Sequence, residues 1–297
     1  MLESMPQVVE PPQISLIMAT YGRATEIGRL VDSLACQTER RFELIMADQN
    51  LDERVQPYVE RARAAGIDVR HLRLSQPGLS AARNDGLQIA RGEWVAFPDD
   101  DCWYAPDALE QLLAVAAQRP SVVGFVGHWI EQVEAHAEIA ADEQRLQLKR
   151  WRRFRGGDAS SITLFMRRVI VEELQGFDAR LGVGRRFGSG EETDFVLRLL
   201  EAGAALERTR AVCVHHAFDR SDALALGKPS LWRFYSSRER GTGALYAKHR
   251  LSAWVILRGM AAPLLRGLSG RQGLPGVIKG AASSFGRLQG WITWPRR

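Results

Sequence analysis

Short apolar runs alternate with helical segments near the start of the chain, and this alternation constrains the fold more than any other feature. The runs are typical of buried strands, and the apolar residues between them recur three or four positions apart, as in helices. The expected elements are strand 14–19, helix 24–37, strand 42–47, helix 55–65, strand 69–74, helix 79–90 and strand 94–97. This order predicts an α/β fold, with a mainly parallel sheet flanked by helices.

The composition is that of a folded protein, with 45% hydrophobic and 25% charged residues over 297 positions. The three cysteines, Cys36, Cys102 and Cys213, form no CxxC pair, which argues against a zinc–thiolate site and fits a reducing compartment. Residues 1–12 show no secretory signal, and no run reaches the roughly 18 apolar residues of a spanning helix. We therefore expect a cytoplasmic protein, with any membrane contact peripheral and on the inner face of the cell membrane.

Charge is distributed unevenly along the chain. Residues 228–297 carry 13 Lys and Arg against the single acid Glu239, a balance of +12, whereas the preceding residues sum to −7. A basic segment of this kind has two candidate anionic partners, nucleic acid and an anionic lipid surface, or it is simply a solvated basic surface.

The basic segment also has an apolar pattern. Residues 251–268 are apolar over most of a helical circumference, and later aromatic residues such as Trp291 and Trp294 alternate with cations. The pattern predicts a basic amphipathic helical extension over 226–297 that binds an anionic membrane surface. The alternative is that these helices pack on the rest of the chain or on a second subunit.

Polar residues gather where the predicted strands end. Thr20, Tyr21 and Arg23 follow the first strand, Asp48 follows the second, and 99–101 are three consecutive aspartates after the fourth. Ligands of parallel α/β sheets bind beyond the carboxyl ends of the strands. Crowded carboxylates at such an edge favour a hard divalent cation, Mg²⁺ or Mn²⁺, although acidic turns after strands also occur without a metal.

A second acidic cluster lies in residues 188–194, where glycines precede Glu191, Glu192 and Asp194 in the first turn of a predicted helix. Acidic residues stabilise a helix N-terminus, but a carboxylate there can also act as a general base towards a hydroxyl. His215 and His216 end an apolar stretch. Either a metal shared with the aspartates or a structural role would account for a histidine at this position.

In this order the motifs resemble the family-2 glycosyltransferases with the GT-A fold. The resemblance covers about residues 14–216. The matching stretches are 14–23, Asp48, 78–86 and 94–103, followed by 167–168, 176–178, 181–184, 190–194 and His215.

The resemblance implies an inverting transfer of a sugar from a nucleotide diphosphate sugar, with a UDP-sugar favoured, to an acceptor hydroxyl. The acceptor would be a saccharide or a lipid-linked molecule, as in the synthesis of a cell-surface polysaccharide or glycolipid. The residues implied in donor binding are Thr20, Tyr21, Arg23, Asp48, Arg83, Asp99 and Asp100. The implied ligands of Mn²⁺ or Mg²⁺ are Asp99, Asp101 and His215.

The catalytic base implied by the resemblance is Glu192, with Asp194 as the second candidate and Glu191 beside them. Two positions depart from the family pattern: Cys102 replaces an acid, and Glu192 is one methylene longer than the usual Asp. The predicted organisation is a leader 1–12, a catalytic domain 13–225 and the basic extension 226–297. Within the catalytic domain we expect a nucleotide-binding half over 13–104 and an acceptor half over 105–225.

Two other classes of protein stay open from the sequence. A nucleotidyltransferase would also combine an α/β fold with carboxylates and a metal, but it usually has a Gly-rich basic phosphate loop, and residues 19–23 are a poor one. A non-catalytic nucleotide or nucleic-acid binder would use the basic segment. We rank the glycosyltransferase above both and expect no nucleic-acid partner.

Overall fold

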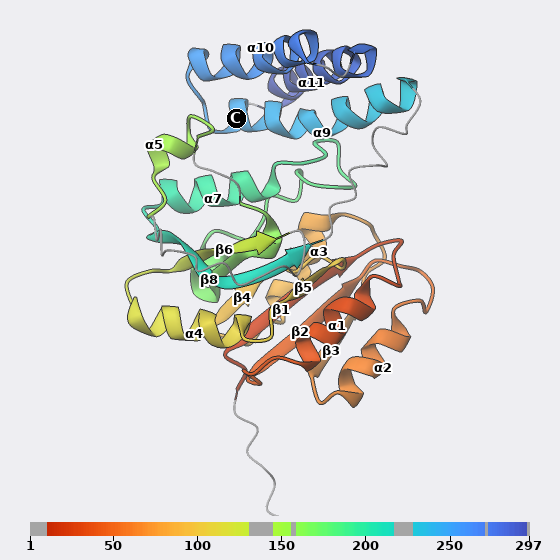
Figure 1. Cartoon of the computed structure of the whole chain (residues 1–297), viewed down its shortest axis with the longest axis vertical. Helices are drawn as coiled ribbons and strands as arrows, with labels where there is room; N and C mark the ends of the chain where they lie inside the picture. The colour runs from red at the N-terminus through yellow and green to blue at the C-terminus, as the bar shows by residue number, and fades with distance from the viewer. Residues whose placement is uncertain (1–10, 131–144, 156–158, 217–227, 271–272, 296–297) are drawn as a thin grey trace, which may run out of the picture.

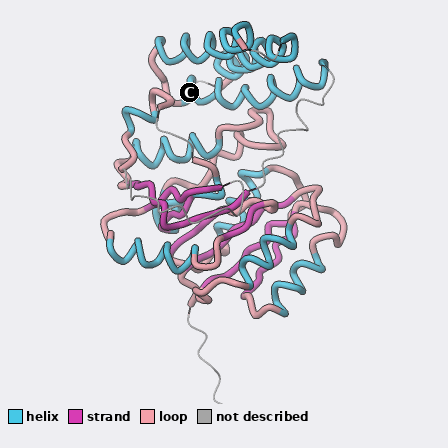
Figure 2. The backbone as a smooth tube through the Cα atoms, viewed as in Figure 1, coloured by secondary structure: helices cyan, strands magenta, loops and turns pink. Residues whose placement is uncertain are grey.

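The computed structural model describes residues 11–130, 145–155, 159–216, 228–270 and 273–295. Residues 1–10 of the predicted leader and the predicted boundary at 225–226 lie outside the described residues. Figure 1 shows the sheet with its helices below and a separate group of helices above, and Figure 2 shows the same division by type of element.

All the elements predicted for the first half are present. They are β1 (Ile14–Thr20), α1 (Ile27–Ala35), β2 (Phe42–Asp48), α2 (Gln56–Ala64), β3 (Asp68–Arg73), α3 (Leu79–Gln88) and β4 (Trp94–Ala96). The helix α1 begins three residues later than expected, because Ala24 and Thr25 form turns in which their carbonyls accept from Ile27 and Gly28. This later start leaves Arg23 in a loop beyond the end of β1.

The second half adds four strands to the same sheet. Its elements are β5 (Cys102–Tyr104), α4 (Ala108–Gln118), β6 (Gly124–Ile130), α5 (Leu148–Trp151), a 3₁₀ turn at Ser161–Thr163, β7 (Leu164–Arg167), α6 (Arg168–Glu173), α7 (Glu191–Glu201) and β8 (Leu206–His216). The sheet order is β3-β2-β1-β4-β7-β6-β8-β5. The four neighbouring strands β3, β2, β1 and β4 are parallel to one another, whereas β7 is antiparallel to both β4 and β6.

Each face of the sheet has its own core, because successive side chains of a strand point to opposite faces. On β1, Leu16 and Met18 pack with α1, α2 and α4, whereas Ile17 packs with α3 and α7. All three side chains are fully buried. Because β1 is covered on both faces, its sequence is a nearly continuous apolar run rather than an alternation of apolar and polar residues.

Three helices form a further layer: α9 (Lys228–Lys248), α10 (Ala253–Ser269) and α11 (Gly273–Thr293). In Figure 1, α7 lies between the sheet and this layer. Glycines permit the close packing of α11 on α9, since a Cβ at Gly243 would collide with the backbone of Arg287. In the part of the chain that the structure describes, none of the helices is both long and apolar enough to cross a membrane.

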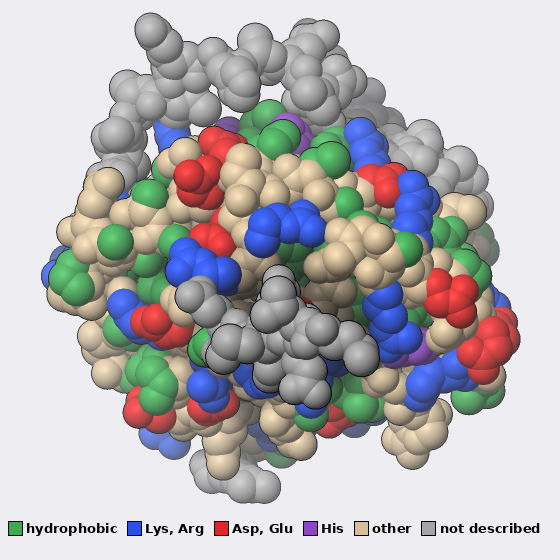
Figure 3. Space-filling model, turned by 90° about the horizontal axis from the view of Figure 1, so that it is seen from below, with side chains coloured by type: hydrophobic (Ala, Val, Ile, Leu, Met, Phe, Trp, Pro, Cys, Tyr) green, Lys and Arg blue, Asp and Glu red, His purple; other side chains and the backbone are tan. Residues whose placement is uncertain are grey.

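The surface at the end of the molecule opposite this helical layer has a mixture of charged, polar and apolar side chains. Figure 3 shows Lys and Arg side chains interspersed with Asp and Glu, and apolar side chains scattered among them. Single apolar side chains on a surface are normal and require no partner.

Candidate active site

The acidic turn after β4 is held against the end of β1. Asp99 forms an isolated parallel bridge with Ala19, and the carboxylate of Asp100 accepts a hydrogen bond of 2.7 Å from the Thr20 hydroxyl. The Arg23 guanidinium donates to Asp100 at 2.9 Å and also contacts Asp101. Burial raises the pKa of Asp100, and Thr20 and Arg23 oppose this effect. The predicted donor-binding residues that follow β1 and the aspartates that follow β4 therefore lie in contact with one another.

Asp101 lies between two cationic groups. Its carboxylate contacts Arg23 and lies 3.2 Å from Nε2 of His216. Burial alone would raise the pKa of Asp101, but His216 and Arg23 outweigh it and lower the pKa. The hydrogen bond to Asp101 correspondingly raises the pKa of His216.

The two histidines at the end of β8 face different surroundings. The ring of His215, predicted as a metal ligand, stacks on Trp103 with the centroids 5.4 Å apart, and burial and the nearby Arg29 lower its pKa. His216, not His215, lies beside Asp101. The reason is the strand geometry: neighbours on β8 point to opposite faces, and β5 pairs Trp103 with His215 and Cys102 with His216.

Arg83 connects the acidic turn to the second half of the chain. Its guanidinium is fully buried and donates from Nη2 to Asp99 at 2.7 Å and to the Ser161 hydroxyl at 2.7 Å. Its Nε and Nη1 atoms are buried and have no hydrogen-bond partner among the described residues. A buried guanidinium with free donors is costly and suits an anionic ligand such as a diphosphate.

Glu191 and Glu192 begin α7 on the far side of Arg83. Gly190, with φ of 92°, occupies the left-handed conformation that lets the chain turn into the helix. Burial raises the pKa of Glu192, although the charge of Arg83 and the nearby backbone of Ser161 oppose this. Burial and the charge of Glu192 raise the pKa of Glu191 to about 8.

Asp194 faces two cationic side chains and a histidine. It accepts a hydrogen bond from Arg198 at 2.8 Å, pairs with Lys248 at 2.7 Å and lies 2.9 Å from Nε2 of His249. These three partners outweigh burial and lower the pKa of Asp194. A carboxylate with three partners and a lowered pKa is a poor proton acceptor.

The remaining predicted donor residues lie at the ends of β1 and β2. Asp48 is fully buried, accepts from the backbone and side chain of Asn50, and lies 2.9 Å from Nε2 of His71. Tyr21 is 61% exposed. The sequence did not single out His71 or Ser161, because neither stands in a motif and only the folded chain brings them to the site.

No group of three or more His, Cys, Asp or Glu side chains is placed to hold a metal ion, as far as the described residues extend. The chemistry of Asp99, Asp101 and His216 nevertheless fits a divalent cation, since Mg²⁺ and Mn²⁺ commonly take one or two carboxylates and complete their shell with phosphate oxygens. Arg23 is half exposed and pairs with Asp100 and Asp101, so a divalent cation bound by Asp101 would compete with its guanidinium.

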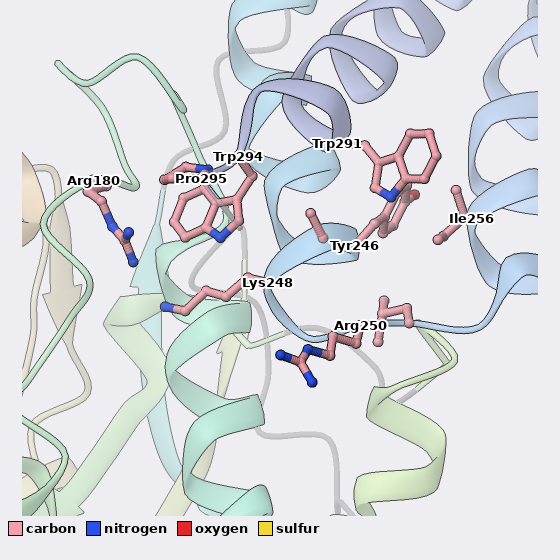
Figure 4. A pocket seen from close by; sticks show the side chains of 10 residues that line it. Arg180, Tyr246, Lys248, Arg250, Ile256, Trp291, Trp294 and Pro295 are labelled. Atoms are coloured by element: carbon pink, nitrogen blue, oxygen red, sulfur yellow. The ribbon is translucent and has the colours of Figure 1, made fainter. Parts of the chain in front are cut away.

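A separate cavity of about 710 Å³ is lined by residues of α9, α10 and α11 and of the loops next to them. Figure 4 shows Arg180 and Lys248 beside Trp294 at its edge, and their cationic groups lie 4.2 and 5.7 Å from the Trp294 ring. Both cations pair with Asp178. The cavity wall therefore ties the catalytic half of the chain to the C-terminal helices through Lys248, which also reaches Asp194.

The fold and the arrangement of the site define a glycosyltransferase of the GT-A type. Residues 15–174 match the model of the family described as glycosyl transferase family 2. The chain belongs to this family, as its sequence motifs predicted. The expected α/β architecture with a helical C-terminal part is also confirmed.

Individual relatives match over shorter stretches. An uncharacterized glycosyltransferase of Haemophilus influenzae is 34% identical over 115 residues, which cover 39% of this chain and 38% of that protein. The putative glycosyltransferase EpsH of Bacillus subtilis is 32% identical over 115 residues, covering 39% of this chain and 33% of its own length. The chain thus matches less than two fifths of the length of either relative.

Solved structures share the fold over nearly the whole chain. The mannosyltransferase PcManGT of Pyrobaculum calidifontis, in complex with GDP-Man and Mn²⁺, superposes with a TM-score of 0.64 at 15% identity, covering 95% of this chain and 86% of that one. The S. aureus TarS fragment 1-349, in complex with UDP-GlcNAc, superposes with a TM-score of 0.58 at 15% identity, covering 92% and 90%. At this identity the likeness establishes the fold alone.

Proposed function

We propose that this protein is an inverting, divalent-cation-dependent glycosyltransferase that moves a sugar from a nucleotide diphosphate sugar to an acceptor hydroxyl. The main support is the position of Arg83, which binds Asp99 of the acidic turn and the Ser161 hydroxyl, and whose charge also acts on Glu192. One buried cation thus links the predicted donor side to the predicted base.

On the donor side, Thr20, Tyr21, Arg23 and Asp48 bind the nucleoside, and Arg83 lies near the diphosphate and supplies a positive charge. Asp99, Asp101 and His216 hold Mn²⁺ or Mg²⁺, which when bound stabilises the negative charge of the leaving diphosphate. A UDP-sugar is the favoured donor, and the solved relatives crystallised with UDP-GlcNAc and GDP-Man are compatible with either base.

On the acceptor side, Glu192 takes the proton of the attacking hydroxyl. The acceptor oxygen forms a bond to the anomeric carbon from the face opposite the donor phosphate, and the bond from that carbon to the phosphate oxygen breaks with its electron pair leaving on the nucleoside diphosphate. A single displacement of this kind inverts the anomeric configuration. The raised pKa of Glu192 supports the role, because a base is more effective when its pKa lies nearer the working pH. The acceptor is a saccharide or a lipid-linked molecule of a cell-surface polysaccharide or glycolipid.

The test is a thermal-shift panel of UDP, GDP, dTDP and their sugars, with and without Mn²⁺ or Mg²⁺. A ligand that binds only the native state raises the melting temperature. We expect a cation-dependent shift with one nucleotide, lost in Asp101→Ala and kept in Asp32→Ala, a surface aspartate of α1. The absence of a shift with every nucleotide, or an equal shift in Asp101→Ala, would contradict the donor site.

The products separate this proposal from a nucleotidyltransferase. Sugar transfer releases a nucleoside diphosphate, whereas nucleotidyl transfer to a sugar phosphate releases pyrophosphate. Incubating the protein with the nucleotide sugar that binds, together with candidate saccharide acceptors, should release the nucleoside diphosphate. Formation of pyrophosphate from a nucleoside triphosphate and a sugar phosphate would replace the proposal.

A further inference from the structure

The helix α10 turns an apolar face outward. Its exposed large apolar side chains lie at spacings of three, seven, one and three residues and so share one side of the helix. They are between 40% and 71% exposed: Trp254, Leu257, Leu264, Leu265 and Leu268. Val255 and Pro263, on the opposite side, are buried against the rest of the protein. A surface helix usually has the reverse pattern, with polar residues outward.

The neighbouring helix α11 also has large apolar side chains on its exposed side. Its exposed apolar residues, between 40% and 60% exposed, are Leu274, Phe285, Leu288 and Ile292. Glycines occupy the buried side and contact α9 and α10. Figure 1 shows α10 and α11 side by side in the outermost layer, so both apolar faces belong to the end of the molecule farthest from α1 and α2. We refer to these nine residues as the outer apolar face.

Cations lie on the other side of the same two helices. A cavity of about 540 Å³ between α9, α10 and α11 is lined by Arg266, Lys279, Arg287 and Glu239, together with Pro263 and glycines of the buried sides. Arg287 pairs with Glu239, and Nζ of Lys279 lies 5.0 Å from the Tyr235 ring, whereas Arg266 forms no ion pair with an acid among the described residues. Residues 228–297 carry a balance of +12. The apolar face therefore lies in the most cationic part of the chain.

We propose that α10 and α11 dock this protein on an anionic lipid bilayer, with the outer apolar face in the interface and the net positive charge of the helical layer, Arg266 and Lys279 included, attracting the anionic headgroups. Interfacial helices combine a large apolar face with cations that meet anionic headgroups. A second copy of the chain is the poorer occupant, because it would bring a like-charged, strongly cationic layer against this one. Nucleic acid would satisfy the cations but leave the leucines in water.

The experiment is flotation of the full chain with vesicles. One set contains phosphatidylcholine alone, and the other contains equal parts of phosphatidylcholine and phosphatidylglycerol. We expect the protein to float with the anionic vesicles at low salt and not with the neutral ones, and to be released by high salt. These vesicles test docking without a nucleotide sugar or an acceptor, so the result is independent of the proposed transfer reaction.

Substitutions in α10 and α11 test whether vesicle binding depends on these two helices. Leu265→Glu with Leu268→Glu should lower partition into anionic vesicles by at least about tenfold, because burial of two leucines is lost and negative charge is added. Arg266→Glu with Lys279→Glu should lower it by a similar factor. The matched controls, Val169→Glu for an exposed apolar residue and Arg63→Glu for an exposed cation, should float like the unmodified chain.

Two results would overturn the proposal. One is the absence of flotation with anionic vesicles at low salt. The other is flotation that the leucine variant leaves unchanged. Light scattering on a sizing column provides the competing outcome: a dimer that Leu265→Glu with Leu268→Glu converts to a monomer, with no flotation, would assign the face to self-association instead.

Discussion

Nζ of Lys248, at the end of α9, lies 2.7 Å from Oδ1 of Asp194 in the first turn of α7. Arg198 and His249 contact the same carboxylate, which is fully buried. The helix that carries Glu191 and Glu192 is thus anchored to the C-terminal helices through Asp194. This relationship gives Asp194 a positioning role and leaves Glu192 as the favoured base.

Asp194→Asn should lower the free energy of unfolding by about 3–5 kcal/mol, because it breaks the buried ion pair with Arg198 and removes one of the two carboxylates that Lys248 contacts. Urea denaturation followed by circular dichroism measures this loss. Asp52→Asn, which removes an exposed carboxylate paired with Arg54, should leave the unfolding midpoint nearly unchanged. If Asp194→Asn were instead as stable as the unmodified chain and inactive, Asp194 would become the better candidate for the base.

Glu192→Gln should reduce kcat by about 10²–10⁴-fold, because the amide cannot accept the proton of the acceptor hydroxyl. The shift in melting temperature caused by the nucleotide should persist, since the carboxylate does not bind the donor. Glu192→Asp is the matched variant: it retains the carboxylate, and it should retain more activity than the amide. Equal activity of Glu192→Gln and the unmodified chain in a single-turnover assay would exclude this role.

The first half of the fold was predictable because each of its elements is encoded locally. Strands such as β1 and β2 are buried on both faces and stand out as apolar runs, and the parallel order then brings Thr20, Asp48 and Asp99 to one edge of the sheet. The second half was less predictable. The strand β7 inserts antiparallel between β4 and β6, and no local pattern fixes that pairing.

Individual site residues were harder to predict where one position changes the direction of a side chain. His215 and His216 are adjacent in an apolar strand, and only the pairing of β8 with β5 decides which of them reaches Asp101. The contacts of Asp194 with Lys248 and His249 span more than fifty residues, so its acidic motif alone did not reveal them. The positions of these side chains depend on pairing between distant parts of the chain, which the local sequence does not show.

His216→Ala should lower the cation-dependent activity by about 10–100-fold and raise the Mn²⁺ concentration needed for half-maximal activity, because it removes an imidazole beside Asp101. His215→Ala should leave that Mn²⁺ concentration unchanged and affect stability instead, since it removes the stacking partner of Trp103. Titrating Mn²⁺ into both variants checks the assignment. A larger Mn²⁺ effect from His215→Ala would favour His215, the metal ligand that the resemblance implies.

Glu191→Gln should change how stability depends on pH. In the native chain burial and the charge of Glu192 raise the pKa of Glu191 from 4.5 to about 8, so the native state retains a proton that the unfolded chain has lost. Its contribution to the free energy of unfolding is therefore complete below about pH 4.5 and is lost as pH rises towards about pH 8. Glutamine is neutral throughout, so the variant should gain stability relative to the unmodified chain across this window.

Denaturant titrations at about pH 4.5 and about pH 8 measure the difference in the free energy of unfolding. The control is Glu173→Gln, which changes an exposed glutamate. A difference between Glu191→Gln and the unmodified chain that stays constant with pH would show that Glu191 is ionised in the native state.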